Sequence, residues 1–139
     1  MKYIILISII SVAYGTPGGA PDCVDRPLGH NGGNNPQTGP SGVTISADES
    51  GDGSVFITVT ADTPFKGILI TSTAAGQFLV PDGQPLQLML CTGITHVSSD
   101  LKSEVSAIFV KADPASKAEF NLIVVRDFET YWTEIKFSS

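Results

Sequence analysis

The stretch that decides the fold is Leu86-Gln-Leu-Met-Leu-Cys91-Thr-Gly-Ile-Thr-His96-Val97. It begins with a short apolar run that ends in Cys91, one of the chain's two cysteines. The other cysteine, Cys23, lies far upstream in a segment with few core-forming residues. A disulfide between Cys23 and Cys91 would pin that segment to the middle of the fold. Closing a loop of this length would stabilise the fold by about 4 kcal/mol if chain entropy is the main effect.

The first fifteen residues predict the compartment in which such a bond forms. They combine one early positive charge, an apolar run, and the small residues Ala13 and Gly15 placed as they are before a signal-peptidase cleavage site. We therefore predict a secretory signal peptide over residues 1–15, because the apolar run falls well short of the about 20 residues that span a bilayer. The expected product is secreted, extracellular and without a membrane span, and its two cysteines pair with each other.

Chain length limits the number of domains, and net charge limits the classes of partner that the protein can bind. The 139 residues suffice for one domain, which we place at residues 16–139. The formal net charge is −6, and removal of Lys2 with the signal peptide makes it one unit more negative. Lysine and arginine are scattered singly, so no basic patch is visible. An acidic surface repels phosphate backbones, and we expect no nucleic-acid partner.

Two regions differ in composition. Residues 16–42 are rich in glycine, proline and asparagine and predict an arm that only Cys23 would hold in place. From residue 43 onward, β-branched and aromatic residues alternate with polar ones between turn signals such as Asp52-Gly53, which predicts short strands. The run 113–119 is expected to be a turn or one helical turn. The expected strands cover residues 43–47, 55–61, 65–73, 78–80, 86–91, 105–110, 120–125 and 131–137, and this spacing predicts an all-β sandwich.

Two histidines follow the cysteines, His30 after Cys23 and His96 after Cys91. A disulfide would bring both imidazoles together, where they could share a hydrogen-bond cluster or bind a metal weakly. The favoured interpretation is that each histidine braces the irregular arm by bonding to its backbone groups. We therefore predict no metal site.

The aromatic residues are assigned mainly to the core. Tyr131 and Trp132 lie on a late strand and are expected to be buried, although an exposed Trp132 could stack on a sugar ring. Gly67, inside a strand, is expected to permit the close approach of backbone or of a neighbouring aromatic ring. The remaining core aromatics are Phe65, Phe78, Phe109 and Phe120.

Nothing in the sequence indicates catalysis. Both cysteines are expected to be paired, no Gly-x-Ser-x-Gly turn occurs, and there are only two histidines. Acids such as Asp48 and Glu49 fall in expected turns, where carboxylates usually face water. We predict a protein that is not an enzyme and uses no cofactor.

Several motifs together resemble the reeler (reelin N-terminal) domain family, and within it the small single-domain insect defence proteins. The resemblance implies an immunoglobulin-like antiparallel sandwich with Cys23 bonded to Cys91, and extracellular recognition of microbial surfaces or matrix without catalysis. Departures include His30-Asn31 where many relatives have His-Gly, and the lack of a second disulfide. The matching residues are Cys23, Pro27, His30, Asn35-Pro36-Gln37-Thr38, Phe65-Lys-Gly67-Ile-Leu-Ile, Gly76-x-Phe78, Cys91, Thr95-His96, Lys102, Phe120 and Tyr131-Trp132.

The leading hypothesis is a secreted recognition protein of innate immunity and antibacterial defence. Its expected partner is a microbial surface polysaccharide or a lipid-linked glycan. The alternative is an extracellular adhesion or matrix module that binds a protein, a glycosaminoglycan or a host cell surface. His30, His96 and Trp132 are the residues assigned to binding or to bracing the arm.

Overall fold

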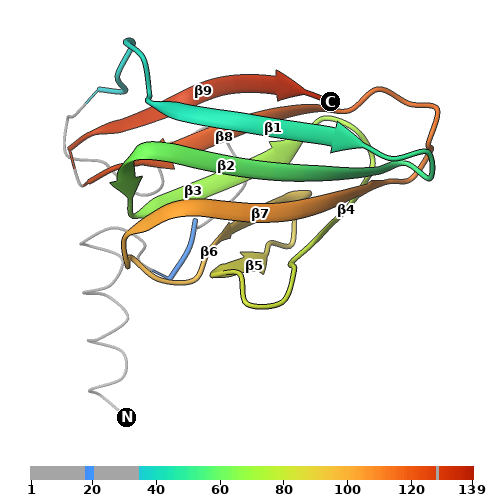
Figure 1. Cartoon of the computed structure of the whole chain (residues 1–139), viewed down its shortest axis with the longest axis horizontal. Coiled ribbons are helices and arrows are strands. Elements are labelled where there is room, and N and C mark those ends of the chain that lie inside the picture. Colours follow the sequence, from blue (N-terminus) through green and yellow to red (C-terminus); the bar gives the residue numbers. More distant parts are fainter. Residues whose placement is uncertain (1–17, 21–34, 128) are drawn as a thin grey trace.

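A computed structural model describes residues 18–20, 35–127 and 129–139, and these residues form two antiparallel sheets (Figure 1). The four-stranded sheet has the order β1-β2-β7-β4, and the five-stranded sheet has the order β5-β6-β3-β8-β9. The strands are β1 (Val43–Glu49), β2 (Ser54–Phe65), β3 (Gly67–Ser72), β4 (Gly76–Leu79), β5 (Leu86–Leu88), β6 (Gly93–His96), β7 (Lys102–Lys111), β8 (Glu119–Val125) and β9 (Tyr131–Ser138).

The four-stranded sheet follows the alternation seen in the sequence. In β2, Val55, Ile57 and Val59 are buried, while the residues between them are exposed or half-buried. Cross-strand partners share a face of a sheet, so Val105 and Phe109 of β7, opposite Val59 and Val55, are buried as well. The prediction of strands with one buried and one solvated face is confirmed for this sheet.

The five-stranded sheet is buried on both faces near its centre. Strand β3 lies between β6 and β8, and its residues 67–70 are all buried, as the uniform apolar run predicts for a central strand. Ile68 and Ile70 face the other sheet, whereas Leu69 faces away from it. The outward cluster contains Leu69, Ile123, Val125 and Tyr131, with Ala20 and Met89 packed against it.

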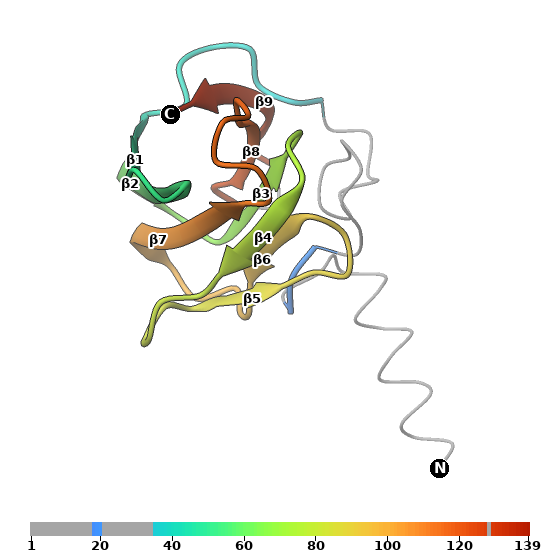
Figure 2. The ribbon, with the colours of Figure 1, turned by 90° about the vertical axis from the view of Figure 1, so that its right-hand side faces the viewer.

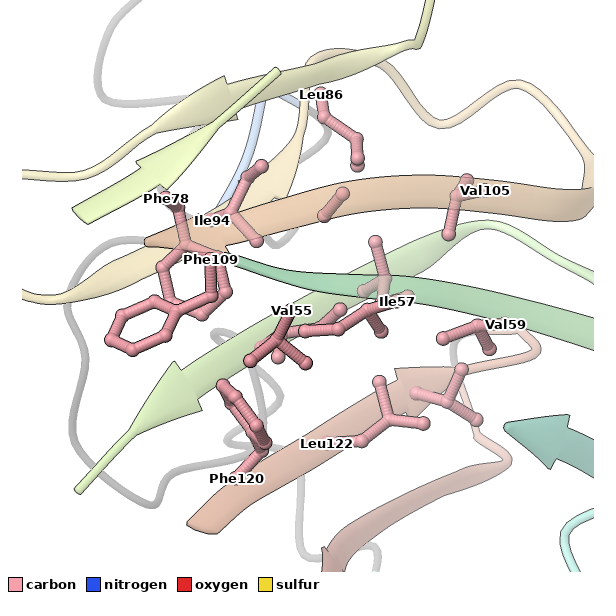
Figure 3. Close-up of a cluster of buried hydrophobic side chains, with 14 of the residues drawn as sticks. Val55, Ile57, Val59, Phe78, Leu86, Ile94, Val105, Phe109, Phe120 and Leu122 are labelled. Atoms are coloured by element: carbon pink, nitrogen blue, oxygen red, sulfur yellow. The ribbon is translucent and has the colours of Figure 1, made fainter. Parts of the chain in front are cut away.

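The main core lies between the sheets, and both contribute to it (Figures 2 and 3). Phe109 is at its centre, with ring centroids 4.9 Å from Phe78 and 5.4 Å from Phe120. The contact with Phe120 is edge-to-face, which places the positive ring edge against the negative face. Phe65 is also buried, so the predicted core positions of the four phenylalanines are confirmed.

The prediction of a strand over residues 86–91 is wrong in its second half. Strand β5 ends at Leu88, and Cys91 lies in the turn before β6. The turn is tight because the Gly93 N–H donates to the Cys91 carbonyl at 2.8 Å and the Met89 N–H donates to the Gly93 carbonyl at 3.1 Å. An apolar run alone could not reveal this reversal, because its residues carry no turn signal before Gly93.

Two further predictions concern the ends of the chain and its turns. Of the expected turn at 113–119, residues 113–118 form a turn and Glu119 already begins β8; the Ser116 N–H donates to the Asp113 carbonyl at 3.0 Å. Within the described residues, no helix is long and apolar enough to cross a membrane. The expected signal peptide at 1–15 lies outside those residues, as does most of the expected arm.

Candidate functional site

The first described part of the arm, residues 18–20, lies against β5 and β6 (Figures 1 and 2). The Ala20 N–H donates to Thr95 Oγ1 at 3.0 Å, and the same hydroxyl donates to the Ile68 carbonyl at 2.7 Å. The Gln87 side-chain amide donates to the Gly18 carbonyl and, at 2.9 Å, to the His96 carbonyl. Thr95 and Gln87 therefore hold this part of the arm, a role the sequence did not assign to them.

The second described part of the arm, residues 35–42, meets the start of β9. The Gln37 N–H donates to the Tyr131 carbonyl at 2.8 Å, and the Trp132 indole N–H donates to the Gly39 carbonyl at 3.0 Å. Trp132 as a whole residue is 7 % exposed, and the Arg126 guanidinium lies 4.7 Å from the centroid of its ring. Trp132 is thus a core residue that braces the arm, and its ring is not available to stack on a sugar.

His96 is buried beside β3. Its Nδ1 accepts a hydrogen bond from the Ile68 N–H at 3.0 Å, which fixes the ring against β3. Gly67 makes room for the ring, because a Cβ there would lie 3.0 Å from His96 Cε1. The expected close approach at Gly67 is therefore found, and the neighbouring ring is an imidazole.

That His30 and His96 lie close together stays a prediction. Both His30 and Cys23 lie outside the described residues. Cys91 is exposed and is not a free thiol. Groups of three or more histidine, cysteine, aspartate or glutamate side chains that could hold a metal are absent from the part of the chain that the structure describes.

A hollow of about 580 Å³ lies on the outer face of the five-stranded sheet, over β3, β8 and β9. This volume is within the range of about 300–1,000 Å³ typical of ligand sites. Thr71, Asn121 and Lys136 are direct cross-strand partners and form one row across its surface. The buried side chains of Leu69 and Ile123 form the next row, so polar groups lie beside an apolar floor.

Asn121 has unmet hydrogen-bonding capacity in this hollow. Its Nδ2 donates to the Thr133 carbonyl at 3.0 Å, while its buried Oδ1 has no hydrogen-bond partner among the described residues. A buried polar atom without a partner costs about 1–3 kcal/mol, and a ligand could donate to this oxygen only after the side chain turned into the hollow. The hydroxyl, amide and ammonium groups of the polar row themselves favour a ligand that carries hydroxyl or amide groups.

The charges around the hollow balance. Lys136 and Glu119 are the charged side chains among the described lining residues, one of each sign. Ser72, Thr73 and Ser138 add hydroxyl groups, and the half-buried Phe137 adds a ring stacked on Phe120 at 5.0 Å. A neutral ligand with many hydroxyls and apolar C–H faces, such as a saccharide, matches this lining.

The sequence reasoning did not identify this site. The one sequence feature that points to this hollow is Asn121, a lone amide inside the apolar run Phe120-Asn-Leu-Ile-Val-Val125. Thr71 and Lys136 look like ordinary solvent-facing strand residues. They join Asn121 only through the pairing of β3, β8 and β9, which the sequence alone does not reveal.

The two antiparallel sheets define an all-β module. The family model of the Reeler domain matches residues 21–139, and the chain belongs to the Reeler domain family, an extracellular-type module. No curated protein matches the chain. The family assignment confirms the resemblance found in the sequence, while the likeness to insect defence proteins stays a prediction.

Solved structures with the same fold include domains of F-spondin. The human F-spondin reeler domain (fragment 1) has a TM-score of 0.61 and 14% identity, with 76% of this chain and 94% of that chain covered. The Reelin-N domain of F-spondin has a TM-score of 0.63 and 15% identity, with coverages of 78% and 92%. At these identities, the likeness concerns the fold.

Proposed function

We propose that this protein is a secreted, non-catalytic recognition module of antibacterial defence. It binds carbohydrate on microbial surfaces in the hollow over β3, β8 and β9. The observation that carries the proposal is the row of Thr71, Asn121 and Lys136 beside an apolar floor, in a hollow that further hydroxyl groups line. Sugar hydroxyls donate and accept at once, so they can bond to these neighbouring polar side chains.

The lining favours a neutral glycan over a sulfated one. A glycosaminoglycan carries closely spaced negative charges and calls for several cations, whereas Lys136 is accompanied by Glu119 in the hollow. The whole chain is acidic, with a formal charge of −6, which adds long-range repulsion of polyanions. The adhesion or matrix alternative is therefore ranked second.

An immunoglobulin-like arrangement is part of the same proposal. Strands β1, β2 and β7 are neighbours, as A, B and E are in immunoglobulin domains, and β3, β8 and β9 are neighbours, as C, F and G are. A bond from Cys91 to Cys23 would hold the arm beside the five-stranded sheet. Cys91 is not a free thiol, and Cys23 is the other cysteine of the sequence, which supports this pairing.

The test is a pull-down of the mature chain with heat-killed bacteria, insoluble β-glucan and heparin-agarose. Asn121→Ala and Thr71→Val remove single polar groups from the hollow, and each is expected to lower binding about fivefold to tenfold. The matched control is Ser103→Ala, an exposed residue of β7 that does not line the hollow.

The outcomes separate the candidate functions. Retention on bacteria or β-glucan that both hollow variants weaken supports the proposal. Thermal unfolding of each variant shows whether it is folded, and Thr71→Val keeps the side-chain shape if Asn121→Ala destabilises the sheet. Retention on heparin alone, or binding that no hollow variant changes, would contradict the proposal.

A further inference from the structure

The turn between β5 and β6 presents leucine side chains to water. We call residues 88–93 the hairpin tip. Leu88 is 56 % exposed and Leu90 is 111 % exposed, which is more than in an extended reference chain. The tip lies at the edge of the molecule, next to the end of β3 (Figure 2). Large apolar side chains held this far into water are costly unless another apolar phase covers them.

The hairpin tip is held in shape by its backbone. The Met89 N–H donates to the Gly93 carbonyl at 3.1 Å, and the Ser72 N–H donates to the Thr92 carbonyl at 3.4 Å. Met89 is half-buried and packs against the cluster of Leu69, Ile123, Val125 and Tyr131 on the outer face of the five-stranded sheet. Because side chains alternate along an extended segment, Leu88 and Leu90 point the other way.

The described residues that line the space around the two leucines carry no charge. A shallow hollow of about 230 Å³ separates the tip from β4, and Phe78 and Leu88 line its two sides. None of its described lining residues is ionisable. Residues 88–93 also contain no charged residue, although the chain as a whole is acidic. The described part of the tip therefore carries no charge that insertion into an apolar phase would remove from water.

We propose that the hairpin tip inserts into the surface of a neutral lipid bilayer. A projecting, uncharged, leucine-bearing turn suits a fluid surface, which closes around it, whereas a protein partner would need a matching concave site. The acidic chain gains nothing from anionic head groups, so zwitterionic lipid is the expected partner. The hairpin tip lies beside the carbohydrate hollow, but insertion does not require a sugar.

The experiment is flotation of the mature chain with phosphatidylcholine vesicles, with and without added phosphatidylserine. Leu90→Ser is expected to lower the partition coefficient about tenfold. The matched control is Leu101→Ser, because Leu101 is 64 % exposed but follows the opposite end of β6. Leu90→Trp gives a direct readout, since the one native tryptophan, Trp132, is buried.

Flotation that Leu90→Ser reduces and Leu101→Ser leaves unchanged supports the proposal, as does a blue shift of Leu90→Trp emission on adding vesicles. Absence of flotation, an equal loss in both serine variants, or a concentration-dependent dimer that Leu90→Ser abolishes would each overturn it. Asn121→Ala is expected to float like the wild type, so failure of the carbohydrate proposal would remain distinguishable.

Discussion

Lys102 is a buried lysine at the start of β7, with 7 % of its surface exposed. Burial lowers the pKa of its ammonium, and the nearby Asp100 partly opposes this effect. Lys102 is one of the residues that resemble the family pattern, but the sequence does not show that it is buried, because its acceptors are backbone atoms of two loops. The Lys102 Nζ donates to the carbonyls of Lys66 at 2.8 Å, Ser98 at 2.7 Å and Asp100 at 2.6 Å.

Replacing Lys102 with methionine is expected to lower the free energy of unfolding by about 2 kcal/mol. The three carbonyls lose a common donor, while the apolar part of the side chain is kept. Urea unfolding measures the change. The exposed Lys117→Met is the control and is expected to change stability by less than about 0.5 kcal/mol. Equal losses in the two variants would show that the bonds of Lys102 contribute nothing specific.

Glu49 makes the stability of the folded state depend on pH. The Lys111 ammonium donates to its Oε2 at 2.9 Å and the Ser139 hydroxyl to its Oε1 at 3.0 Å, and these bonds lower the pKa of Glu49 from its ordinary value of 4.5. A carboxylate with a lowered folded-state pKa stabilises the fold above its unfolded pKa, and this contribution is lost as the pH falls through the folded value.

The variant Glu49→Gln is therefore expected to be less stable than the wild type at pH 6. The difference should shrink as the pH is lowered below 4.5, because protonation of Glu49 removes the same charge from the wild type. Urea unfolding at several pH values measures it. A difference that stays constant down to pH 3 would show that the ionised form of Glu49 is not the cause.

At the scale of elements, the sequence predicted most strands but missed strand β6 and the turn that leads into it. Alternation placed β1, β2, β7 and β9 closely, because each buries one face against the other sheet. The error at Cys91 arose where an apolar run crosses a hairpin, since periodicity does not mark a reversal. The hollow was missed for a related reason: its row of polar residues depends on which strands are neighbours.

The contact between β3 and β6 depends on a glycine. In Gly67→Ala, the new Cβ would lie 3.0 Å from His96 Cε1 and 3.4 Å from Val125 Cβ. Neither neighbour can move freely in a packed sheet, so the expected loss of stability is about 1–3 kcal/mol. Thermal or urea unfolding measures it. Gly51→Ala is the control because no heavy atom lies within 4 Å of the added Cβ. A Gly67→Ala variant as stable as Gly51→Ala would contradict this packing.

At the scale of the whole molecule, the sequence predicted an all-β fold, and the structure shows two antiparallel sheets with the main core between them. The sequence could not show how an arm without a core of its own is held. The described contacts come from Thr95, Gln87 and Trp132, which are residues of the sheet. Their roles depend on where the arm crosses them.

The pairing of Cys23 with Cys91 predicts a property of the intact chain. Non-reducing peptide mapping should recover the two cysteines in one linked peptide pair. Replacing both with serine is expected to lower the free energy of unfolding by about 4 kcal/mol, because the unfolded chain regains the entropy of a long open loop. Free thiols in the oxidised, folded protein, or linkage between two chains, would contradict this pairing.

The most direct test of carbohydrate recognition is an NMR titration of the isotope-labelled mature chain with soluble β-glucan oligosaccharides. We expect the backbone amides of Thr71, Asn121 and Lys136 and the Asn121 side-chain amide to shift most, in a saturable way, with little change at Trp132. Shifts confined to other surfaces, or no shifts at millimolar sugar, would contradict the assignment of this hollow as the binding site.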